Sequence, residues 1–277
     1  MTQLPSLKEL IIKYDLMPQK KLGQNFILDS NVTDKIVSFA GSLADKTVIE
    51  VGPGPGGLTR SILNAGANKV FAIELDFRCL EALTELETFY YPRLNVISGD
   101  ALKIDISTIA DAPKGIIANL PYNVATELLI GWLQRIDQLD FMILMFQREV
   151  ANRIVSLDNS DGYGRLGVMC NWLCHTEKVY DLPPEVFMPA PKVHSAVVKF
   201  TPRNDISEKL PYWLSMELVT KVAFNQRRKM LRSSLKSLFK DETVEILQAH
   251  NIDSTMRAEN LTIDQFFALA KFVFGYK

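Results

Sequence analysis

The sequence has few cysteines, no long apolar run and almost no net charge. Its three cysteines, Cys79, Cys170 and Cys174, are too few and too unevenly spaced for a disulfide framework, which favours a reducing, intracellular compartment. The N-terminus lacks the basic and apolar regions of a secretory signal, and no apolar run approaches the roughly 18 residues that span a bilayer. We therefore expect a cytoplasmic protein without a membrane segment.

Histidine is as scarce as cysteine, which argues against a metal centre. Cys170, Cys174 and His175 lie close enough to share a helix face, but no second Cys/His cluster completes the usual set of zinc ligands. We interpret the cysteines as buried helix residues and expect no metal. A Ser/His/Asp hydrolase is equally unsupported, because the sequence has no G-x-S-x-G motif.

The charges nearly cancel, but they are unevenly distributed. The formal net charge is −1, yet nine Lys or Arg residues stand against three acids between Arg203 and Lys240. The preceding two-thirds of the chain carries a slight acidic excess. This asymmetry favours a module that binds a polyanion, although a solvated helical face would have the same composition.

Apolar runs of strand length alternate with helical patterns through the first two hundred residues. The helical patterns include residues 58–66 and 77–87, and the apolar runs are at 46–51, 69–74, 94–98, 115–119 and 140–146. Runs without in/out alternation are typical of parallel strands buried on both faces, with helices as the crossovers. The pattern predicts an α/β fold with a Rossmann-like, doubly wound sheet.

The C-terminal third changes character. After a helix expected over 149–157, the runs KVYDLP and SAVVKFTP are joined without a helix, so we expect them to pair as a terminal hairpin of the sheet. From about residue 205 the pattern is helical, which places a boundary near Thr201–Asp205. We predict a first domain over 1–203 and a small all-helical domain over 204–277.

A glycine-rich turn, Glu50–Gly57, follows the first expected strand. Glycines such as Gly52 let the chain bend tightly and let a ligand lie against the main chain. Glu74 ends the next strand, 22 residues after Gly52, where a carboxylate could accept the ribose hydroxyls of an adenosine. Asp100 follows the third strand and could accept the exocyclic amine of the adenine. NAD sites and S-adenosylmethionine sites share this arrangement.

Two prolines in the turn favour S-adenosylmethionine over NAD. A dinucleotide site uses backbone N–H donors for its pyrophosphate, and Pro53 and Pro55 each remove one such donor. S-adenosylmethionine has no phosphate and carries a positively charged sulfur, so acidic and carbonyl oxygens suit it better. Any single acid could instead cap a helix or face solvent, but acids or glycines at three successive strand ends favour a methyl-donor site.

The fourth expected strand ends in Asn119-Leu120-Pro121-Tyr122, the most specific motif of the chain. The lone pair of an exocyclic base amine is delocalised into the ring and must be localised before it can attack a methyl group. The Asn119 side-chain oxygen and a neighbouring carbonyl can both accept hydrogen bonds from that amine. Tyr122 offers a flat face on which a base can stack. The motif therefore indicates methylation of a base amine, although a strand-ending turn with a core tyrosine would read the same.

These residues, with others in the same order along the chain, resemble the small-subunit ribosomal RNA adenine dimethyltransferases of the kasugamycin-resistance type. The resemblance covers nearly the whole chain. Besides the motifs above, it rests on residues 20–28, 74–76, 99–101, 119–123, 147–151, 163–166, 186–193, 224–229 and 257–259. It implies the methyltransferase fold predicted above, S-adenosylmethionine as the cofactor and RNA as the substrate.

The resemblance also implies a role for each site residue. Cofactor contacts are implied for Asn25, Ile27, Gly52, Glu74, Asp100 and Asn119. In the transfer itself, Asn119 and the carbonyl of Leu120 would hold the target amine. Tyr122 and Phe187 would sandwich the flipped adenine. Phe187 lies in a proline-braced loop, which we expect to hold its ring exposed.

A basic segment follows the predicted boundary. Basic residues recur every four positions at Arg228, Arg232, Lys236 and Lys240. On a continuous helix they would form one basic stripe, beside an apolar stripe of Leu231, Leu235 and Leu238. The resemblance assigns ribosomal RNA recognition to this domain, although a helix that docks onto another protein is an alternative. The expected RNA contacts are Arg148, Arg227, Arg228, Lys229, Arg232 and Lys236, with Lys20 and Lys21 extending the surface.

The leading hypothesis is a methyltransferase that dimethylates N6 of two adjacent adenines in the 3′-terminal hairpin of small-subunit rRNA. The expected substrate is an assembling pre-30S particle, and the enzyme is expected to be a monomer. One alternative is the related macrolide-resistance enzyme, which modifies large-subunit rRNA and usually has isoleucine where Leu120 stands. Others are a ribosome-assembly or transcription factor and, more distantly, an NAD-dependent oxidoreductase.

Overall fold

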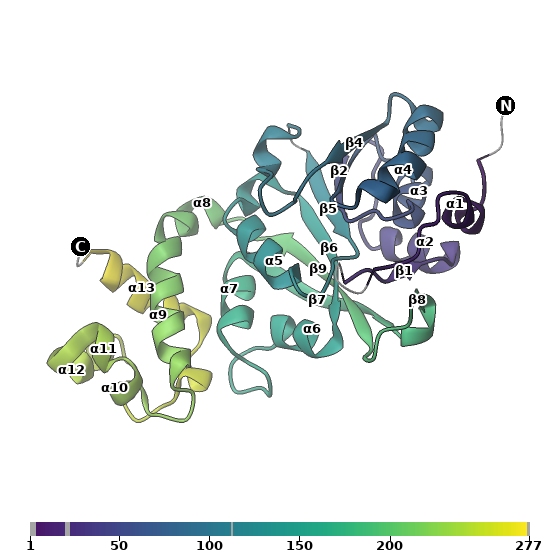
Figure 1. The fold of residues 1–277 in the computed structure, drawn as a ribbon. Helices are drawn as coiled ribbons and strands as arrows, with labels where there is room; N and C mark the ends of the chain where they lie inside the picture. The colour runs from purple at the N-terminus through teal and green to yellow at the C-terminus, as the bar shows by residue number, and fades with distance from the viewer. Residues whose placement is uncertain (1–3, 20–22, 112, 276–277) are drawn as a thin grey trace. The chain divides into compact units, whose positions relative to one another are not determined.

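A computed structural model describes residues 4–19, 23–111 and 113–275. The chain packs into two compact units, Met1–Ala151 with Glu177–Pro202, and Asn152–Thr176 with Arg203–Lys277. The first unit is an α/β structure and the second is mostly helical (Figure 1). Residues 152–176, which the sequence places before the boundary, pack with the helical unit. Where the functional domains begin and end stays a prediction.

A mixed sheet forms the centre of the first unit. Within the described residues its seven strands, in sheet order, are β4 (Leu94–Ser98), β3 (Lys69–Glu74), β2 (Thr47–Val51), β5 (Lys114–Ala118), β6 (Phe141–Gln147), β9 (Ser195–Pro202) and β7 (Cys174–Leu182). The first five are parallel, with Thr47 of β2 opposite Lys69 of β3 and Lys114 of β5. β9 runs antiparallel to β6. The predicted Rossmann-like sheet is therefore confirmed.

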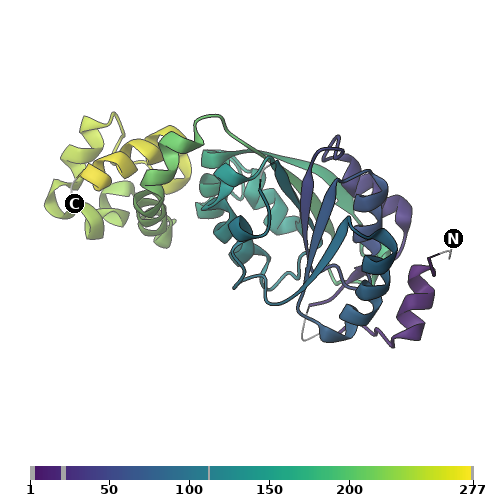
Figure 2. The same ribbon diagram turned by 90° about the horizontal axis from the view of Figure 1, so that it is seen from above.

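The central strands are buried because helices cover both faces. β5 is buried at all five positions and β6 at six of seven, as their continuous apolar sequences predict. Figures 1 and 2 show α2 (Ser30–Ser38), α3 (Gly57–Asn64) and α4 (Phe77–Tyr90) on one face and α5 (Ala125–Leu133) on the other. Side chains of α2, α3 and α4, together with those of α1 (Leu7–Lys13), form one apolar core with the sheet.

The two runs expected to form a terminal hairpin do lie together in the sheet. β9 lies between β6 and β7 in the sheet. The edge strand is therefore β7, although it comes before β9 in the chain. The excursion between them contains β8 (Phe187–Met188), which pairs antiparallel with β1 (Phe26–Ile27) as a separate two-stranded sheet. Cys174 begins β7, so the prediction that it lies on a helix is wrong, while Cys170 is a buried residue of α7 (Arg165–Leu173).

The second unit is assembled around two long helices. α9 (Trp213–Asn225) packs against α13 (Ile263–Gly275), and α7 packs on both. The remaining helices are α6 (Arg148–Val155), which begins in the first unit, and α8 (Ile206–Lys209), α10 (Leu231–Ser234), α11 (Lys236–Phe239) and α12 (Thr243–Ala249). None of the helices in the described part of the chain combines the length and apolarity that crossing a bilayer requires.

The continuous basic helix expected after Phe224 is not formed, so that prediction is wrong. The chain leaves the helix at Gln226, is extended at Met230 and has a positive φ of 55° at Lys240. The break has a tertiary cause, because the N–H groups of Leu231 and Arg232 donate to the carbonyls of Met256 and Ser254 at 2.7 and 3.1 Å. These bonds replace those of a continuous helix. The expected apolar side is partly confirmed, since Leu231 and Leu235 are fully buried and Leu238 is half-buried.

Candidate active site

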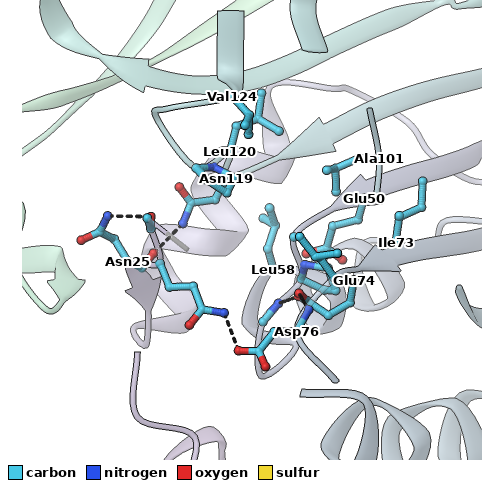
Figure 3. A pocket seen from close by; sticks show the side chains of 18 of the residues that line it. Asn25, Glu50, Leu58, Ile73, Glu74, Asp76, Ala101, Asn119, Leu120 and Val124 are labelled. Atoms are coloured by element: carbon cyan, nitrogen blue, oxygen red, sulfur yellow. Dashed lines mark hydrogen bonds between the residues drawn. The ribbon is translucent and has the colours of Figure 1, made fainter. Parts of the chain in front are cut away.

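The carboxyl ends of four parallel strands meet at one edge of the sheet and form a pocket. The loops after β2, β3, β4 and β5 line it, together with residues 23–27 (Figure 3). This is where doubly wound folds bind their ligands. All six residues expected to contact the cofactor line the pocket: Asn25, Ile27, Gly52, Glu74, Asp100 and Asn119. The structure therefore brings together residues that lie almost a hundred positions apart in the chain.

The glycine-rich turn closes one wall of the pocket. Gly52, Gly54 and Gly56 have φ values of +70°, +56° and +88°, which other residues rarely adopt. Space is also short at Gly54, where a Cβ atom would lie 2.7 Å from the ring of Phe26. The turn therefore requires glycine for its backbone shape and, at Gly54, for the close approach of Phe26.

Glu74 is fixed at the end of β3 and is almost fully buried. Its Oε2 accepts from the backbone N–H of Gly54 at 2.9 Å, and its Oε1 accepts from that of Asp76 at 2.7 Å. Burial raises the pKa of the Glu74 carboxyl, and the two backbone donors oppose the rise. Each carboxylate oxygen can accept a further hydrogen bond, so Glu74 can still serve ribose hydroxyls.

Asp76 is a pocket residue that sequence reasoning did not select. Burial opposes its ionisation, but hydrogen bonds from Arg78 and Gln24 prevail and lower the pKa of Asp76. Gln24 donates from Nε2 to Oδ2 of Asp76 at 2.9 Å, which ties the segment before β1 to the loop after β3. The available signal was that Asp76 stands two residues after Glu74, in the 74–76 motif that contributes to the resemblance. Lys20, Lys21 and Leu22 of that motif lie outside the described residues.

Asp100, which is expected from the sequence to contact the adenine of the cofactor, follows β4 and lines the pocket. Its Oδ1 accepts from the N–H of Leu102 at 3.0 Å, and its Oδ2 faces Lys103 Nζ at 3.8 Å. The side chain is about one-third exposed, at 32%. Oδ1 of the carboxylate is therefore anchored, and Oδ2 can still accept a hydrogen bond from an amine.

The amide of Asn119 has a defined orientation. Its Nδ2 donates to the backbone carbonyl of Asn25 at 2.8 Å (Figure 3). A carbonyl can only accept, so this bond assigns the –NH₂ group and identifies Oδ1 as the acceptor of the amide. Leu120 follows with its side chain buried, and both residues line the pocket. The site thus holds an oriented acceptor at the end of β5.

Tyr122 lines a second pocket next to the first. Gly23, Asn25 and Asn123 line both pockets, and the second is completed by residues of α5, β6 and α6. The Tyr122 hydroxyl is hydrogen-bonded to that of Ser195, a fully buried residue at the start of β9. Burial raises the pKa of Tyr122, so its phenol stays neutral. Ser195 is a contact that the sequence did not indicate, because it is 73 positions away.

The expectation that Phe187 presents an exposed ring is wrong. Its side chain is 5% exposed and belongs to the apolar core, because Phe187 pairs with Ile27 between β8 and β1. Phe187 is not among the described residues that line either pocket. A part for this ring in stacking a base stays a prediction.

The residues expected to bind RNA do not line the pockets. Arg148 is exposed at the start of α6. The other five belong to the second unit, where Arg228, Lys229, Arg232 and Lys236 are also exposed. Arg227 has a structural contact there, since its guanidinium donates to the carbonyl of Tyr163 at 2.6 Å. The described residues contain no group of three or more His, Cys, Asp or Glu placed to hold a metal ion.

Glu50, in β2, is a second pocket residue that sequence reasoning quoted only as part of the turn motif. Its side chain is 0% exposed, and neither carboxyl oxygen has a hydrogen-bond partner among the described residues. Burial raises the pKa of the Glu50 carboxyl to about 8, with a further contribution from the neighbouring charge of Glu74. The protein therefore contains a carboxylic acid that is largely neutral at pH 7.

This buried acid predicts an unusual pH dependence of stability. The folded protein keeps a proton on Glu50 that the unfolded chain loses above its ordinary pKa of 4.5, so rising pH favours unfolding up to about pH 8. Relative to Glu50→Gln, the wild-type free energy of unfolding should fall by up to about 1.4 kcal/mol per pH unit in that window. Denaturant unfolding of both proteins at pH 5, 6, 7 and 8 measures the difference. A constant difference across this range would contradict the prediction.

Together, the doubly wound sheet and this pocket define a nucleoside-cofactor enzyme, and the lining identifies its cofactor type. Among the described residues, the ionisable side chains that line the pocket are all acids: Glu50, Glu74, Asp76 and Asp100. A pyrophosphate would meet no cation there. A cofactor with a positively charged sulfur fits, so the residues present suit S-adenosylmethionine.

Comparison with known proteins agrees with this class. The family model for ribosomal RNA adenine dimethylase matches residues 17–274. A ribosomal RNA small subunit methyltransferase A from Sinorhizobium fredii is 51% identical over 99% of this chain and 92% of its own length. The protein of the same name from Brucella anthropi is 52% identical over 96% of each chain.

Solved structures agree as well. A dimethyladenosine transferase from Plasmodium falciparum matches 87% of this chain and 94% of its own, with 25% identity and a TM-score of 0.76. The 23S rRNA methyltransferase ErmE shares the fold, with a TM-score of 0.66 and 24% identity over 89% of this chain and 98% of its own. The chain belongs to the ribosomal RNA adenine dimethylase family, and it is an S-adenosylmethionine-dependent methyltransferase.

Proposed function

We propose that this enzyme methylates N6 of two adjacent adenines in the 3′-terminal hairpin of small-subunit rRNA, giving N6,N6-dimethyladenosine. The observation that carries the proposal is the oriented amide of Asn119 beside an acid-lined cofactor pocket. Relatives about half identical over nearly the whole chain are named small subunit methyltransferases, which supports the choice of subunit. The enzyme would act as a cytoplasmic monomer on an assembling pre-30S particle.

The chain's own residues account for activation of the target amine. Bound S-adenosylmethionine supplies a methyl group on a positively charged sulfur. Oδ1 of Asn119 and the main-chain carbonyl of Leu120 would each accept an N–H of the adenine amine, which localises the nitrogen lone pair. The nitrogen gains a positive charge as it is methylated, and both acceptors stabilise that charge. The proton then passes to water, so no strong base is required.

Cofactor contacts follow the order of the strands. Glu74, after β3, would accept the ribose hydroxyls, and Asp100, after β4, would accept the adenine amine. Asn25, Ile27 and Gly52 would contact the methionine end through the main chain and side chains that line the pocket. The roles proposed for Glu74 and Asp100 agree with the acceptor capacity that each carboxylate retains.

A direct test is methyl transfer from radiolabelled S-adenosylmethionine to purified ribosomal particles. Unmethylated small subunits and large subunits are compared, and labelled rRNA is digested to nucleosides. Label in small-subunit rRNA, recovered as N6,N6-dimethyladenosine, is expected. Label confined to large-subunit rRNA would overturn the proposed substrate, and tight rRNA binding without label would favour an assembly factor.

The hydrogen bond between Tyr122 and Ser195 predicts a coupled effect on the base-binding side. If Tyr122 stacks on the target adenine, Ser195 fixes the ring in place. Tyr122→Phe and Ser195→Ala should each lower kcat/KM by about threefold to tenfold, because each removes one hydrogen bond. Since both remove the same bond, the double variant should be no worse than either single one. Tyr122→Ala should cost about tenfold or more through lost stacking.

A double variant whose loss of kcat/KM equals the sum of the two single losses, on a free-energy scale, would contradict this coupling. Such additivity would show that Ser195 acts through packing in β9 rather than through the Tyr122 hydroxyl. A Tyr122→Ala variant that keeps wild-type kcat/KM would remove the stacking role itself.

The exposed basic residues of the second unit are proposed to contact RNA phosphates. Arg228, Arg232 and Lys236 remain exposed although the helix is broken. A triple change to glutamine should weaken rRNA binding and reduce the slope of log affinity against log salt by about 2–3, because each phosphate contact contributes roughly 0.7–0.9. Filter binding at several salt concentrations measures both quantities.

A matched control is the triple glutamine variant of exposed lysines in the first unit, Lys8, Lys35 and Lys69. It makes the same change in net charge and should leave the salt slope within about one unit of the wild type. Equal effects of the two triple variants would show that binding follows net charge alone and would refute a specific surface.

A further inference from the structure

The carboxyl group of Glu50 is a buried polar group without a well-formed hydrogen bond to any described residue. Both oxygens lack a hydrogen bond within the described residues, and the side chain lines the cofactor pocket (Figure 3). A buried carboxyl without a full hydrogen bond destabilises a folded protein, so its presence calls for a functional explanation. One donor, the Thr59 hydroxyl on α3, lies close by and lowers the pKa of Glu50, but burial outweighs this effect and the pKa stays raised.

The order of the strands places Glu50 against a particular part of the cofactor. Asp100 follows β4, Glu74 ends β3, Glu50 lies in β2 and Asn119 follows β5, and these strands are neighbours in that order. Adjacent strands lie about 4.8 Å apart, so the four groups succeed one another across the pocket. The place of the sulfur rests on the roles proposed above: a cofactor whose adenine binds at Asp100 and whose ribose binds at Glu74 would have its sulfur next, on the side of Glu50 and Asn119.

We propose that Glu50 recognises the positive charge on the cofactor sulfur and that its carboxyl loses a proton when the methyl donor binds. The pocket then distinguishes S-adenosylmethionine from S-adenosylhomocysteine, the product of methyl transfer, whose sulfur is neutral. Donor binding releases one proton from Glu50 to solvent and forms a carboxylate–sulfonium pair. Once the methyl group has left, the carboxylate faces a neutral sulfur and takes a proton back, which weakens product binding.

The surroundings of Glu50 support this exchange. The charge of Glu74 on β3 contributes to the raised pKa of Glu50, and the other ionisable side chains that line the pocket within the described residues, Asp76 and Asp100, are also acids. Repulsion among them favours the neutral form of Glu50 in the free protein. A bound cation reverses this preference, because an opposite charge a few ångströms away stabilises the carboxylate.

Isothermal titration calorimetry tests the proposal without any methyl transfer. Binding of donor and product to the wild-type protein is measured at pH 7 in phosphate and in Tris, whose different ionisation enthalpies reveal protons released on binding. Close to one proton more should be released per molecule of donor than per molecule of product. The α-ammonium group is common to both ligands, so it cancels in the difference. Sinefungin, which carries an ammonium in place of the methylated sulfur, should behave like the donor.

The variant Glu50→Gln should lose the extra proton and bind donor and product more equally. Its donor preference should fall by about tenfold, the factor that corresponds to one unit of change in pKa on binding. Glu81→Gln, which changes an exposed acid on α4, should match the wild type. If Glu50→Gln does not fold, the proton count of the wild type still decides.

Equal proton release by donor and product would overturn the proposal, because it would place Glu50 against the ammonium that they share. No proton release by either ligand would overturn it too, because Glu50 would then keep its proton in the complex. A donor preference that survives in a folded Glu50→Gln protein would assign the discrimination to other residues.

Discussion

Replacing Asn119 with alanine is expected to lower the rate of methyl transfer by about 100- to 1000-fold, the range found when one oriented hydrogen-bond group of an active site is removed. In the proposed mechanism, the variant loses the side-chain acceptor for the target amine. Its stability should fall by only about 1 kcal/mol, because one hydrogen bond to Asn25 is lost. Single-turnover transfer and denaturant unfolding measure the two effects.

The variant Asn119→Asp separates orientation from the presence of an oxygen. It keeps an acceptor but loses the –NH₂ donor that faces the Asn25 carbonyl, so its carboxylate is repelled from that carbonyl. We expect it to be nearly as impaired as the alanine variant. Asn68→Ala, which changes an exposed asparagine on the surface, is the control and should be fully active. Activity of Asn119→Ala within about tenfold of the wild type would be incompatible with the proposed role.

Replacing Gly54 with alanine should have the second large effect, on both folding and cofactor binding. The new Cβ would lie 2.7 Å from the Phe26 ring, at a backbone φ of +56° that alanine rarely adopts. We expect a loss of about 2–3 kcal/mol in the free energy of unfolding, the usual size for strain combined with overpacking. The strain should also shift the backbone N–H of residue 54, which positions Glu74. We therefore expect S-adenosylmethionine binding to weaken at least about tenfold.

A matched control isolates the backbone contribution. Gly66 also has a positive φ, +90°, but a Cβ there would meet nothing within 4 Å. Gly66→Ala should therefore cost only about 1–2 kcal/mol of stability and leave cofactor binding intact. If calorimetry finds the same loss of binding in both variants, the effect comes from general destabilisation and not from the turn at the pocket.

The sheet and the cofactor pocket could be predicted because their signals are local in the sequence. Each parallel strand reads as a short continuous apolar run, and the predicted β3 and β4 match the observed residues at both ends. The acids and glycines of the pocket directly follow those runs. Since parallel strands present their carboxyl ends at one edge, knowing the strands was enough to bring Glu74, Asp100 and Asn119 together.

The failed predictions concern residues whose environment is set by distant partners. A four-residue period suggested a continuous helix after Phe224, but backbone hydrogen bonds to residues 254 and 256 break it. Phe187 reads as an exposed loop aromatic, yet its pairing with Ile27, 160 positions earlier, buries it. In both cases tertiary contacts overrode a local pattern.

By itself, the sequence determined the fold class, the kind of cofactor and the identity of the residues at the strand ends, because apolar periodicity and turn composition act over a few residues. Only the tertiary structure decided which way the Asn119 amide faces, that Ser195 is hydrogen-bonded to Tyr122 and that the Glu50 carboxyl is buried without a well-formed hydrogen bond to the described residues. Those properties depend on hydrogen bonds and burial between segments that are far apart in the chain. No local pattern of residues records them, since they arise only when the strands pack side by side.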